Sequence, residues 1–152
     1  MKPLWLSARQ REAWRNLALM QLQLQAQLSR ELSLHGLSYQ DYLVLASLSE
    51  RDDGRERIVE LGRELGWEKS RASHHISRMC ERGLVEKQRC PTDQRGLFVN
   101  LTPEGRRAIA AAAPGHVASV RRHFIDLLSD RQLATMNAAA VTVLDHLAAL
   151  AT

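Results

Sequence analysis

The sequence predicts one mainly helical domain, residues 1–152, that carries a small β-hairpin. Helix-capping residues recur along the chain, and Gly or Pro stands where helices should end or begin. Two short strand-like runs flank a tip that reads Pro91-Thr92-Asp93-Gln94-Arg95-Gly96. With 152 residues, of which 45% are hydrophobic, the chain is long enough to bury a core of its own.

The first helix is expected from Ala8 to Leu34, ending at His35 and Gly36. Ser7 and Gln10 have the spacing of a capping box. Leu and Gln alternate over residues 21–28, which is the period of a strand, but the leucines also fit helical spacing. Because Gln, Leu and Ala are good helix formers, we interpret this segment as a helix with two apolar stripes.

The middle of the chain, residues 38–101, is expected to hold three short helices and the hairpin. Ser38 can cap the first of these helices, Asp53-Gly54 marks a polar turn, and Gly83 stands where a left-handed residue ends a helix. The expected elements are helices over Tyr39–Ser49, about Val59–Gly66 and about Lys69–Arg82, and strands over Leu84–Arg89 and Leu97–Leu101.

The last part of the chain should form two helices. Thr102 with Pro103 begins the first, and Ser129 with Gln132 has capping-box spacing before the second. Pro114 and Gly115 are expected to kink or break the first of them. Apolar stripes on residues 8–34 and 103–150 exceed what one small domain buries, which predicts a helical dimerisation layer. The alternative is a self-contained helical bundle.

Positive charge is concentrated in one segment. Residues 69–107 hold nine Lys and Arg against four Asp and Glu, a net charge of +5, whereas the remaining residues hold twelve against thirteen, a net charge of −1. A localised basic surface is typical of a phosphate-binding face. The alternative is an ordinary solvated face.

The helix expected over Lys69–Arg82 has two different faces. Ala72, Ile76 and Met79 have the spacing of a core stripe, and no acid occurs before Glu81. Short hydroxyls, an imidazole and guanidinium groups suit contacts with phosphates and with base edges in the major groove. The expected DNA-binding residues of this helix are Lys69, Ser70, Arg71, Ser73, His74, Ser77 and Arg78.

Several motifs together resemble the MarR family of bacterial winged helix-turn-helix regulators. They are Gly36-Leu37-Ser38-Tyr39, Leu61-x-x-x-Leu65-Gly66, Ser70-x-x-Ser73, Arg78-Met79-x-x-x-Gly83-Leu84-Val85, Asp93-x-Arg95 and Leu101-Thr102-x-x-Gly105. The resemblance covers nearly the whole chain. It implies a homodimer clasped by the first, fifth and sixth helices, with an effector crevice where that layer meets the winged region.

The same resemblance implies a DNA-binding role for the hairpin tip. Arg95 would enter the minor groove, with Asp93 as its orienting partner and Gln94 between them. The whole then reads as a sequence-specific regulator that binds an inverted repeat in double-stranded DNA. We expect a homodimeric, cytoplasmic repressor that a small molecule releases from DNA.

The chain departs from the family pattern at a few positions. His75 stands where the family usually has an aliphatic residue, and we expect a partly buried histidine bonded to backbone. Cys80 reads as a small buried hydrophobe. Cys90, at the hairpin end near Arg89 and Arg95, is the candidate for a redox role, because nearby arginines favour a thiolate.

Other classes of site receive little support from the sequence. His116 and His123 are two turns apart, but no metal-binding motif is present, and we expect neither metal nor cofactor. Trp14 is a candidate for the effector crevice, although a place in a dimer core is favoured for both Trp5 and Trp14. A redox- or metal-responsive regulator and a winged-helix protein-interaction module remain alternatives.

An enzyme is not expected, because adjacent His74 and His75 point about 100° apart on a helix. No signal peptide or apolar run of membrane-spanning length is evident.

Overall fold

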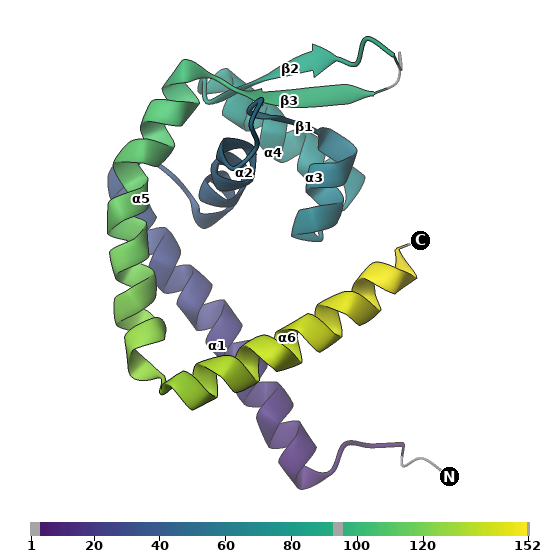
Figure 1. Cartoon of the computed structure of the whole chain (residues 1–152), viewed down its shortest axis with the longest axis vertical. Helices are drawn as coiled ribbons and strands as arrows, with labels where there is room; N and C mark the ends of the chain where they lie inside the picture. Colours follow the sequence, from purple (N-terminus) through teal and green to yellow (C-terminus); the bar gives the residue numbers. More distant parts are fainter. Residues whose placement is uncertain (1–3, 93–95, 152) are drawn as a thin grey trace. The chain divides into compact units, whose positions relative to one another are not determined.

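The computed structural model describes residues 4–92 and 96–151, and Figure 1 shows the order of their elements. The chain divides into two compact units, residues 1–116 and residues 117–152. Asp93, Gln94 and Arg95, three of the expected DNA-binding residues, lie outside the described residues. The helices are α1 (Ala8–Leu32), α2 (Tyr39–Ser49), α3 (Ile58–Leu65), α4 (Lys69–Glu81), α5 (Pro103–His123) and α6 (Asp130–Leu150), and the strands are β1 (Arg55–Arg57), β2 (Val85–Arg89) and β3 (Leu97–Leu101).

Helix boundaries follow the capping residues closely. Capping boxes begin α1 at Ser7 and α6 at Ser129, as predicted, and α2 begins with a capping box between Ser38 and Asp41. After α1 a short 3₁₀ turn over Ser33–His35 ends at Gly36, so the predicted end of this helix is confirmed. Gly83 has φ +75°, the left-handed conformation predicted just beyond α4.

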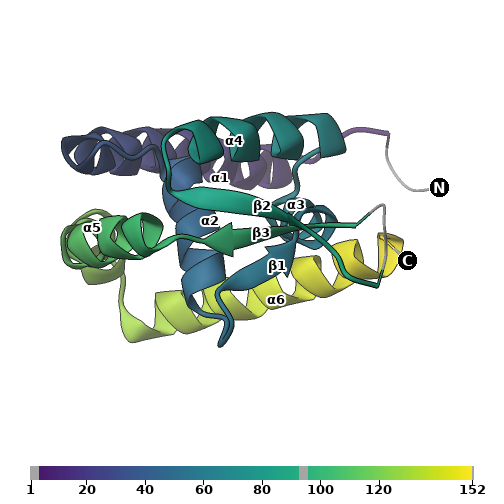
Figure 2. The same ribbon diagram turned by 90° about the horizontal axis from the view of Figure 1, so that it is seen from above.

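The sheet has three strands instead of the predicted two. It is antiparallel, in the order β1-β3-β2, and Glu56 of β1 pairs with Val99 of β3. The sequence Arg55-Glu56-Arg57 looked like part of a polar turn, since three alternating charges carry no strand signal. In Figure 2, α4 runs beside β2, so the β2–β3 hairpin, called the wing below, and the helix that carries most of the expected DNA-binding residues are neighbours within the first unit.

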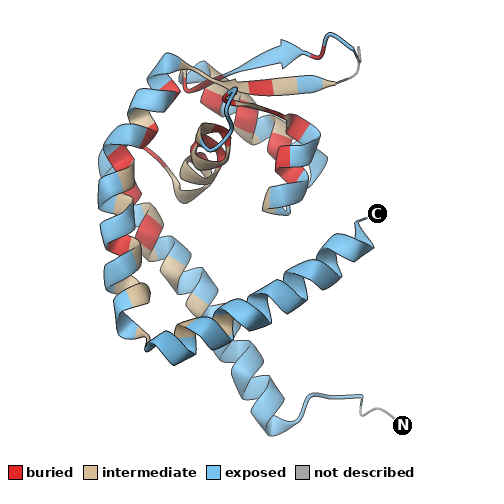
Figure 3. Ribbon diagram, viewed as in Figure 1, coloured by how far each residue is buried: buried red, intermediate tan, exposed pale blue. Residues whose placement is uncertain are grey.

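The core of the first unit lies where α2, α3 and α4 meet the sheet. Figure 3 shows the buried positions gathered there. The predicted core stripe of α4 is confirmed, because Ala72, Ile76 and Met79 are all buried. Among the largest fully buried side chains are Leu45, Leu48, Leu61, Ile76, Met79 and Val99.

The start of α5 is packed closely against the turn after α4. Thr102 Oγ1 donates to Gly83 O at 2.6 Å and accepts from the Gly105 amide at 2.9 Å. A Cβ at residue 105 would lie 2.0 Å from Leu84 O, so only glycine fits there. A kink or a break was predicted at Pro114 and Gly115. The break does not occur, since α5 continues as one helix through both residues.

The second unit leaves its apolar side chains uncovered. None of the residues of α6 is buried, and most of the helix is exposed in Figure 3. With a mean hydropathy of 1.4 over 18 residues, α6 is long and apolar enough to cross a membrane by composition alone. This corrects the sequence-based expectation that no such segment exists. The exposed apolar residues of α6 are Val141, Val143, Leu144, Leu147 and Leu150.

Candidate nucleic-acid interface

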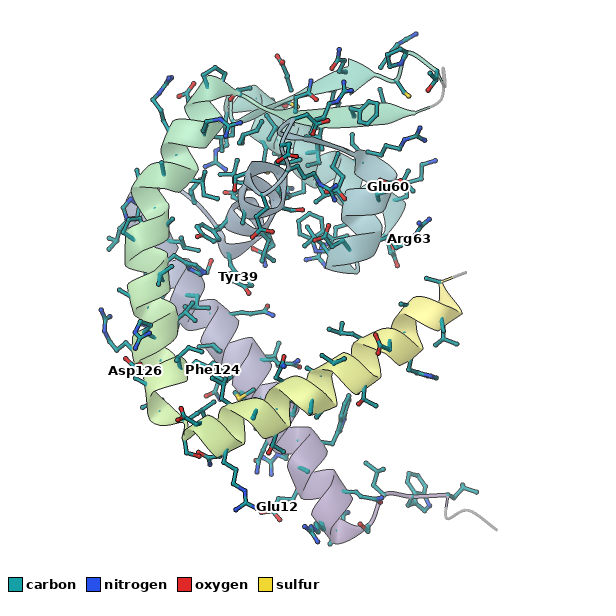
Figure 4. The ribbon with its side chains drawn as sticks, viewed as in Figure 1. Glu12, Tyr39, Glu60, Arg63, Phe124 and Asp126 are labelled. Atoms are coloured by element: carbon teal, nitrogen blue, oxygen red, sulfur yellow. The ribbon has the colours of Figure 1, made fainter. Side chains whose placement is uncertain are left out.

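The outer face of α4 is basic and open to solvent. Lys69, Ser70, Arg71, His74 and Arg78 are exposed, and Ser73 and Ser77 are half-buried. The exposure predicted for this face is therefore confirmed. Neighbouring α3 differs, because its outer side carries both an acid and a base, Glu60 and Arg63, as Figure 4 shows. Compared with α3, the outer face of α4 has fewer carboxylates that would repel a bound anion.

Two arginines of this face rest on ring side chains beneath them. The Arg71 guanidinium lies 5.3 Å from the centre of the Trp67 ring, within the range of a cation–π contact. Arg78 Nη2 lies 3.2 Å from His75 Nδ1. The rings of Trp67 and His75 pack edge to face, with their centres 5.1 Å apart. Both arginines are thus supported from within the winged unit.

The wing contacts α4 through a third cation. Lys87 of β2 donates to Ser77 Oγ at 2.8 Å. The Ser77 hydroxyl therefore has a partner in the protein, although it can still donate its own proton to a nucleic-acid acceptor. This bond fixes strand β2 against the side of α4.

A buried carboxylate joins α2 to α4. Asp41 of α2 is 4% exposed, accepts from Arg82 at 2.7 Å and lies 3.1 Å from His75 Nε2. Its Oδ2 also accepts from the Ser38 amide at 2.9 Å, which closes the capping box of α2. The other end of the Arg82 guanidinium donates to Gly36 O in the turn before α2.

Asp41 stays ionised because its partners outweigh its burial. Burial by itself raises the pKa of a carboxyl group. Hydrogen bonds to His75, Arg82 and the Ser38 backbone lower the pKa of Asp41 by more than burial raises it. The net result is a pKa well below the usual range. A charged Asp41 therefore holds α4 and the Gly36 turn to the start of α2.

A separate cationic cluster lies on β1, beside the wing. Arg55 and Arg57 of β1 lie 4.7 Å and 5.7 Å from the centre of the Phe98 ring of β3. Arg57 also donates to Cys90 Sγ at 3.8 Å. Cys90 is only 6% exposed, so the thiol proposed for a redox role is largely shielded from solvent oxidants.

The remaining predicted residues take different places. His75 is partly buried as predicted, with 12% of its side chain exposed, but its partners are Asp41 and Arg78 and not the backbone. Burial raises the pKa of the half-buried Cys80 thiol, which also packs against the core. Trp14 is 65% exposed on α1.

No group of three potential metal ligands occurs among residues 4–92 and 96–151. His116 instead packs on Tyr42 with ring centres 4.1 Å apart, and burial lowers its pKa. Its Nδ1 is buried and has no hydrogen-bond partner among the described residues.

Sequence reasoning missed several residues that shape this interface. Trp67, Asp41 and Arg82 received no role. Asp41 and Arg82 contact each other across 41 positions of the chain, and Trp67 acts by packing on Arg71 and His75. Only Asp41 had a usable signal, since Ser38 and Asp41 have capping-box spacing with Asp in place of the usual Glu or Gln.

The substitution Asp41→Asn should destabilise the fold at neutral pH. It removes a charge that Arg82 and His75 face, and hydrogen bonds to charged groups contribute about 1.5–3 kcal/mol. Since Arg82 is 43% exposed, we expect the lower half of this range.

The pH dependence follows from the lowered pKa of Asp41. Its stabilisation is fully present above the unfolded value of about 3.9 and is lost as the pH falls through the folded value. The gap between parent and Asp41→Asn in urea unfolding should therefore narrow from pH 7 to pH 3. Asp52→Asn, in the exposed turn before β1, is the control. Equal stability of parent and Asp41→Asn at pH 7 would show that the network contributes nothing.

Comparison with known proteins places the chain among regulators of one fold. Residues 35–96 match the family model described as MarR family. The structure of AbsC, a MarR family transcriptional regulator from Streptomyces coelicolor, is 39% identical, covers 97% of this chain and 99% of that one, and has a TM-score of 0.90. A second MarR family regulator from that species, crystallised in complex with DNA, is 32% identical over 95% of this chain and 91% of its own, also with a TM-score of 0.90.

Curated relatives agree with these structures over a shorter length. Transcriptional regulator HosA of Escherichia coli O111:H- is 32% identical over 53% of this chain. The chain spans 58% to 66% of the length of the curated relatives that it matches. From the near-complete coverage of AbsC together with the winged unit described above, the chain belongs to the MarR family of winged helix-turn-helix transcriptional regulators.

Proposed function

We propose that this protein binds double-stranded DNA in a sequence-specific way and regulates transcription. The observation that carries the proposal is the outer face of α4, which exposes Lys69, Arg71, His74 and Arg78 and has no acid before Glu81. An α-helix fits the major groove, where guanidinium groups read guanine and lysines neutralise phosphates. In this reading Arg71 and His74 contact bases, and Lys69 contacts the backbone.

The tip of the wing is proposed to contact the neighbouring minor groove. Arg95 is the candidate for insertion, Asp93 for orienting it, and Gln94 for a further contact, although all three lie outside the described residues. Support comes from the bond between Lys87 and Ser77, which holds the base of the wing against α4. Arginine is attracted to the negative potential of narrow minor grooves.

The protein is further proposed to act as a cytoplasmic homodimer. Exposed apolar side chains on α1 and α6 support this, because large uncovered apolar surfaces normally mark an interface. Those of α1 include Trp14, Leu17 and Leu22, with 65%, 40% and 67% of their surface exposed. The alternative role proposed for Trp14, lining an effector crevice, is compatible with the same dimer.

A small-molecule effector is proposed to release this repressor from DNA. The supporting observation is the polar atom His116 Nδ1, buried beside Tyr42 with no partner among the residues that the structure describes. Leaving a buried polar atom unbonded is costly, so this position suits a ligand that supplies a hydrogen bond. A redox-responsive regulator is the second candidate, with Cys90 as its thiol, but the burial of Cys90 favours the small molecule.

Base recognition is tested by alanine substitutions on α4. Against an operator selected from random DNA, Arg71→Ala or His74→Ala should change the preferred base at one position. Loss of a bidentate contact costs about 1–3 kcal/mol there, or about 5- to 150-fold in affinity. Lys69→Ala should weaken binding to all DNA sequences alike. Arg9→Ala, on the first turn of α1, is the charge-matched control. If both base-reading variants keep the parent's preference, α4 does not read the sequence.

Dimerisation is tested by sedimentation at micromolar concentration. The parent should have about twice the chain mass of 17.2 kDa. Leu144→Glu should shift it toward the monomer, whereas Thr142→Glu should not, because positions two apart on a helix face about 200° apart. Two recognition helices should then require half-sites about 10 bp apart, centre to centre. A monomeric parent that binds its operator tightly would contradict the proposal.

Effector release is tested by screening small molecules for dissociation of the operator complex. A releasing compound should lose its effect on His116→Ala, while this variant still binds operator as the parent does. Tyr39→Phe, beside the same ring and without the hydroxyl, is the control for a general change in packing. A compound that releases His116→Ala as efficiently as the parent would exclude His116 from the effector site.

A further inference from the structure

A line of four polar side chains crosses the winged unit from the turn before α2 to the outer face of α4. Arg82 bonds Gly36 O and Asp41, Asp41 faces His75, and His75 faces Arg78. The two middle members are shielded, since the side chains of Asp41 and His75 are 5% and 12% exposed. The last, Arg78, is exposed among the candidate DNA-binding residues.

The chemistry of the partners determines which nitrogen of His75 carries the proton. Arginine has only donors, so His75 Nδ1, which lies 3.2 Å from Arg78 Nη2, must be the acceptor. His75 Nε2 then carries the hydrogen, and it lies 3.1 Å from Asp41 Oδ1. Nε2 is buried and its alignment falls short of a hydrogen bond with any described residue, so the attraction between this N–H and the carboxylate is electrostatic. The charged Asp41 therefore selects the tautomer that presents a lone pair to Arg78.

Such a contact changes what Arg78 can do on the surface. A free arginine has many rotamers, and fixing it on binding costs conformational entropy. With one Nη held by His75 from below, the remaining N–H groups of Arg78 keep a restricted direction on the α4 face. His75 lies one turn before Arg78, where i and i+3 side chains meet on a helix.

We propose that His75 is a positioning residue for DNA recognition, which holds Arg78 in its DNA-binding orientation through the tautomer that Asp41 imposes. The inference rests on the proposed function, because it requires Arg78 to contact DNA. It assigns a role in DNA binding to a side chain that is largely buried and makes no DNA contact of its own in the proposed function.

A purely structural role is the competing account. In that account His75 matters because it donates to Asp41 and so ties α4 to α2, and its contact with Arg78 is incidental. The two accounts depend on different nitrogens of the same ring, and amide side chains can separate them. The amide of Asn lies at the level of Nδ1 and can keep the acceptor for Arg78, whereas the amide of Gln lies at the level of Nε2 and can keep the donor to Asp41.

The experiment measures operator binding of the parent, Arg78→Ala, His75→Asn, His75→Gln and His75→Leu. A panel of operators with every single base-pair change, titrated at two salt concentrations, first defines what Arg78→Ala loses. That loss is either preference at one base pair, of about 5- to 150-fold, or a uniform weakening with a smaller salt dependence. Urea unfolding of each variant accompanies the titrations.

We expect His75→Asn to keep the parent's binding profile, and His75→Gln and His75→Leu to reproduce the profile of Arg78→Ala. In the Arg78→Ala background, all three His75 substitutions should have no further effect on DNA binding. Stability should follow the opposite order, with His75→Gln closer to the parent than His75→Asn.

Two results would overturn the inference. If His75→Gln and His75→Leu, once folded, bind the panel as the parent does while Arg78→Ala does not, His75 does not position Arg78. If Arg78→Ala itself binds as the parent does, Arg78 makes no DNA contact and the inference fails with it. The second result does not decide whether the protein binds DNA through α4, because that proposal is tested separately by Arg71→Ala and His74→Ala. The two failures are therefore distinguishable.

Discussion

The buried carboxylate of Asp41 is the constraint on which the winged unit depends. An ion that is 4% exposed is tolerated only when donors surround it, and Asp41 has three, from Ser38, Arg82 and His75. Each donor belongs to a different segment: the N-cap of α2, the end of α4 and the middle of α4. Satisfying one charge therefore fixes the start of α2 against α4.

A second buried acid has the same effect at the other edge of the fold. Glu56 of β1 is also 4% exposed, pairs with Arg51 and accepts from Ser47 at 3.2 Å. Burial raises its pKa, and the Arg51 charge opposes that shift. The contrast with Asp41 is physical, because Glu56 has fewer donors and has Glu64 nearby. Glu56 attaches the added strand β1 to α2, whereas Asp41 aligns two helices.

The outer face of α4 is prepared from inside the protein. Arg71 lies over Trp67, Arg78 is held by His75, and Ser77 is bonded by Lys87 of the wing. Trp67 and His75 contact each other, so the two arginines share one support. Side chains held in this way lose less conformational entropy when they bind, which would favour the DNA binding proposed for this face. In the proposed dimer, the apolar sides of α1 and α6 would be covered by the partner, and the outer faces of the two α4 helices would contact one DNA duplex.

The sequence by itself determined the local structure and which face of α4 is exposed and basic. Capping residues predicted the bounds of α1 to within two residues of those in the structure. The stripe of Ala72, Ile76 and Met79 indicated which side of α4 is buried. These features depend on neighbours along the chain, where spacing is known. The motifs also identified the MarR family. Tertiary structure decided the rest, because the deciding partners are far apart in sequence: β1 exists only through its pairing with β3, and His75 is defined by Asp41, 34 positions earlier in the chain. A histidine in a helix reads the same in sequence whether backbone, carboxylate or guanidinium faces it, and only the packing of α2 on α4 selects among them.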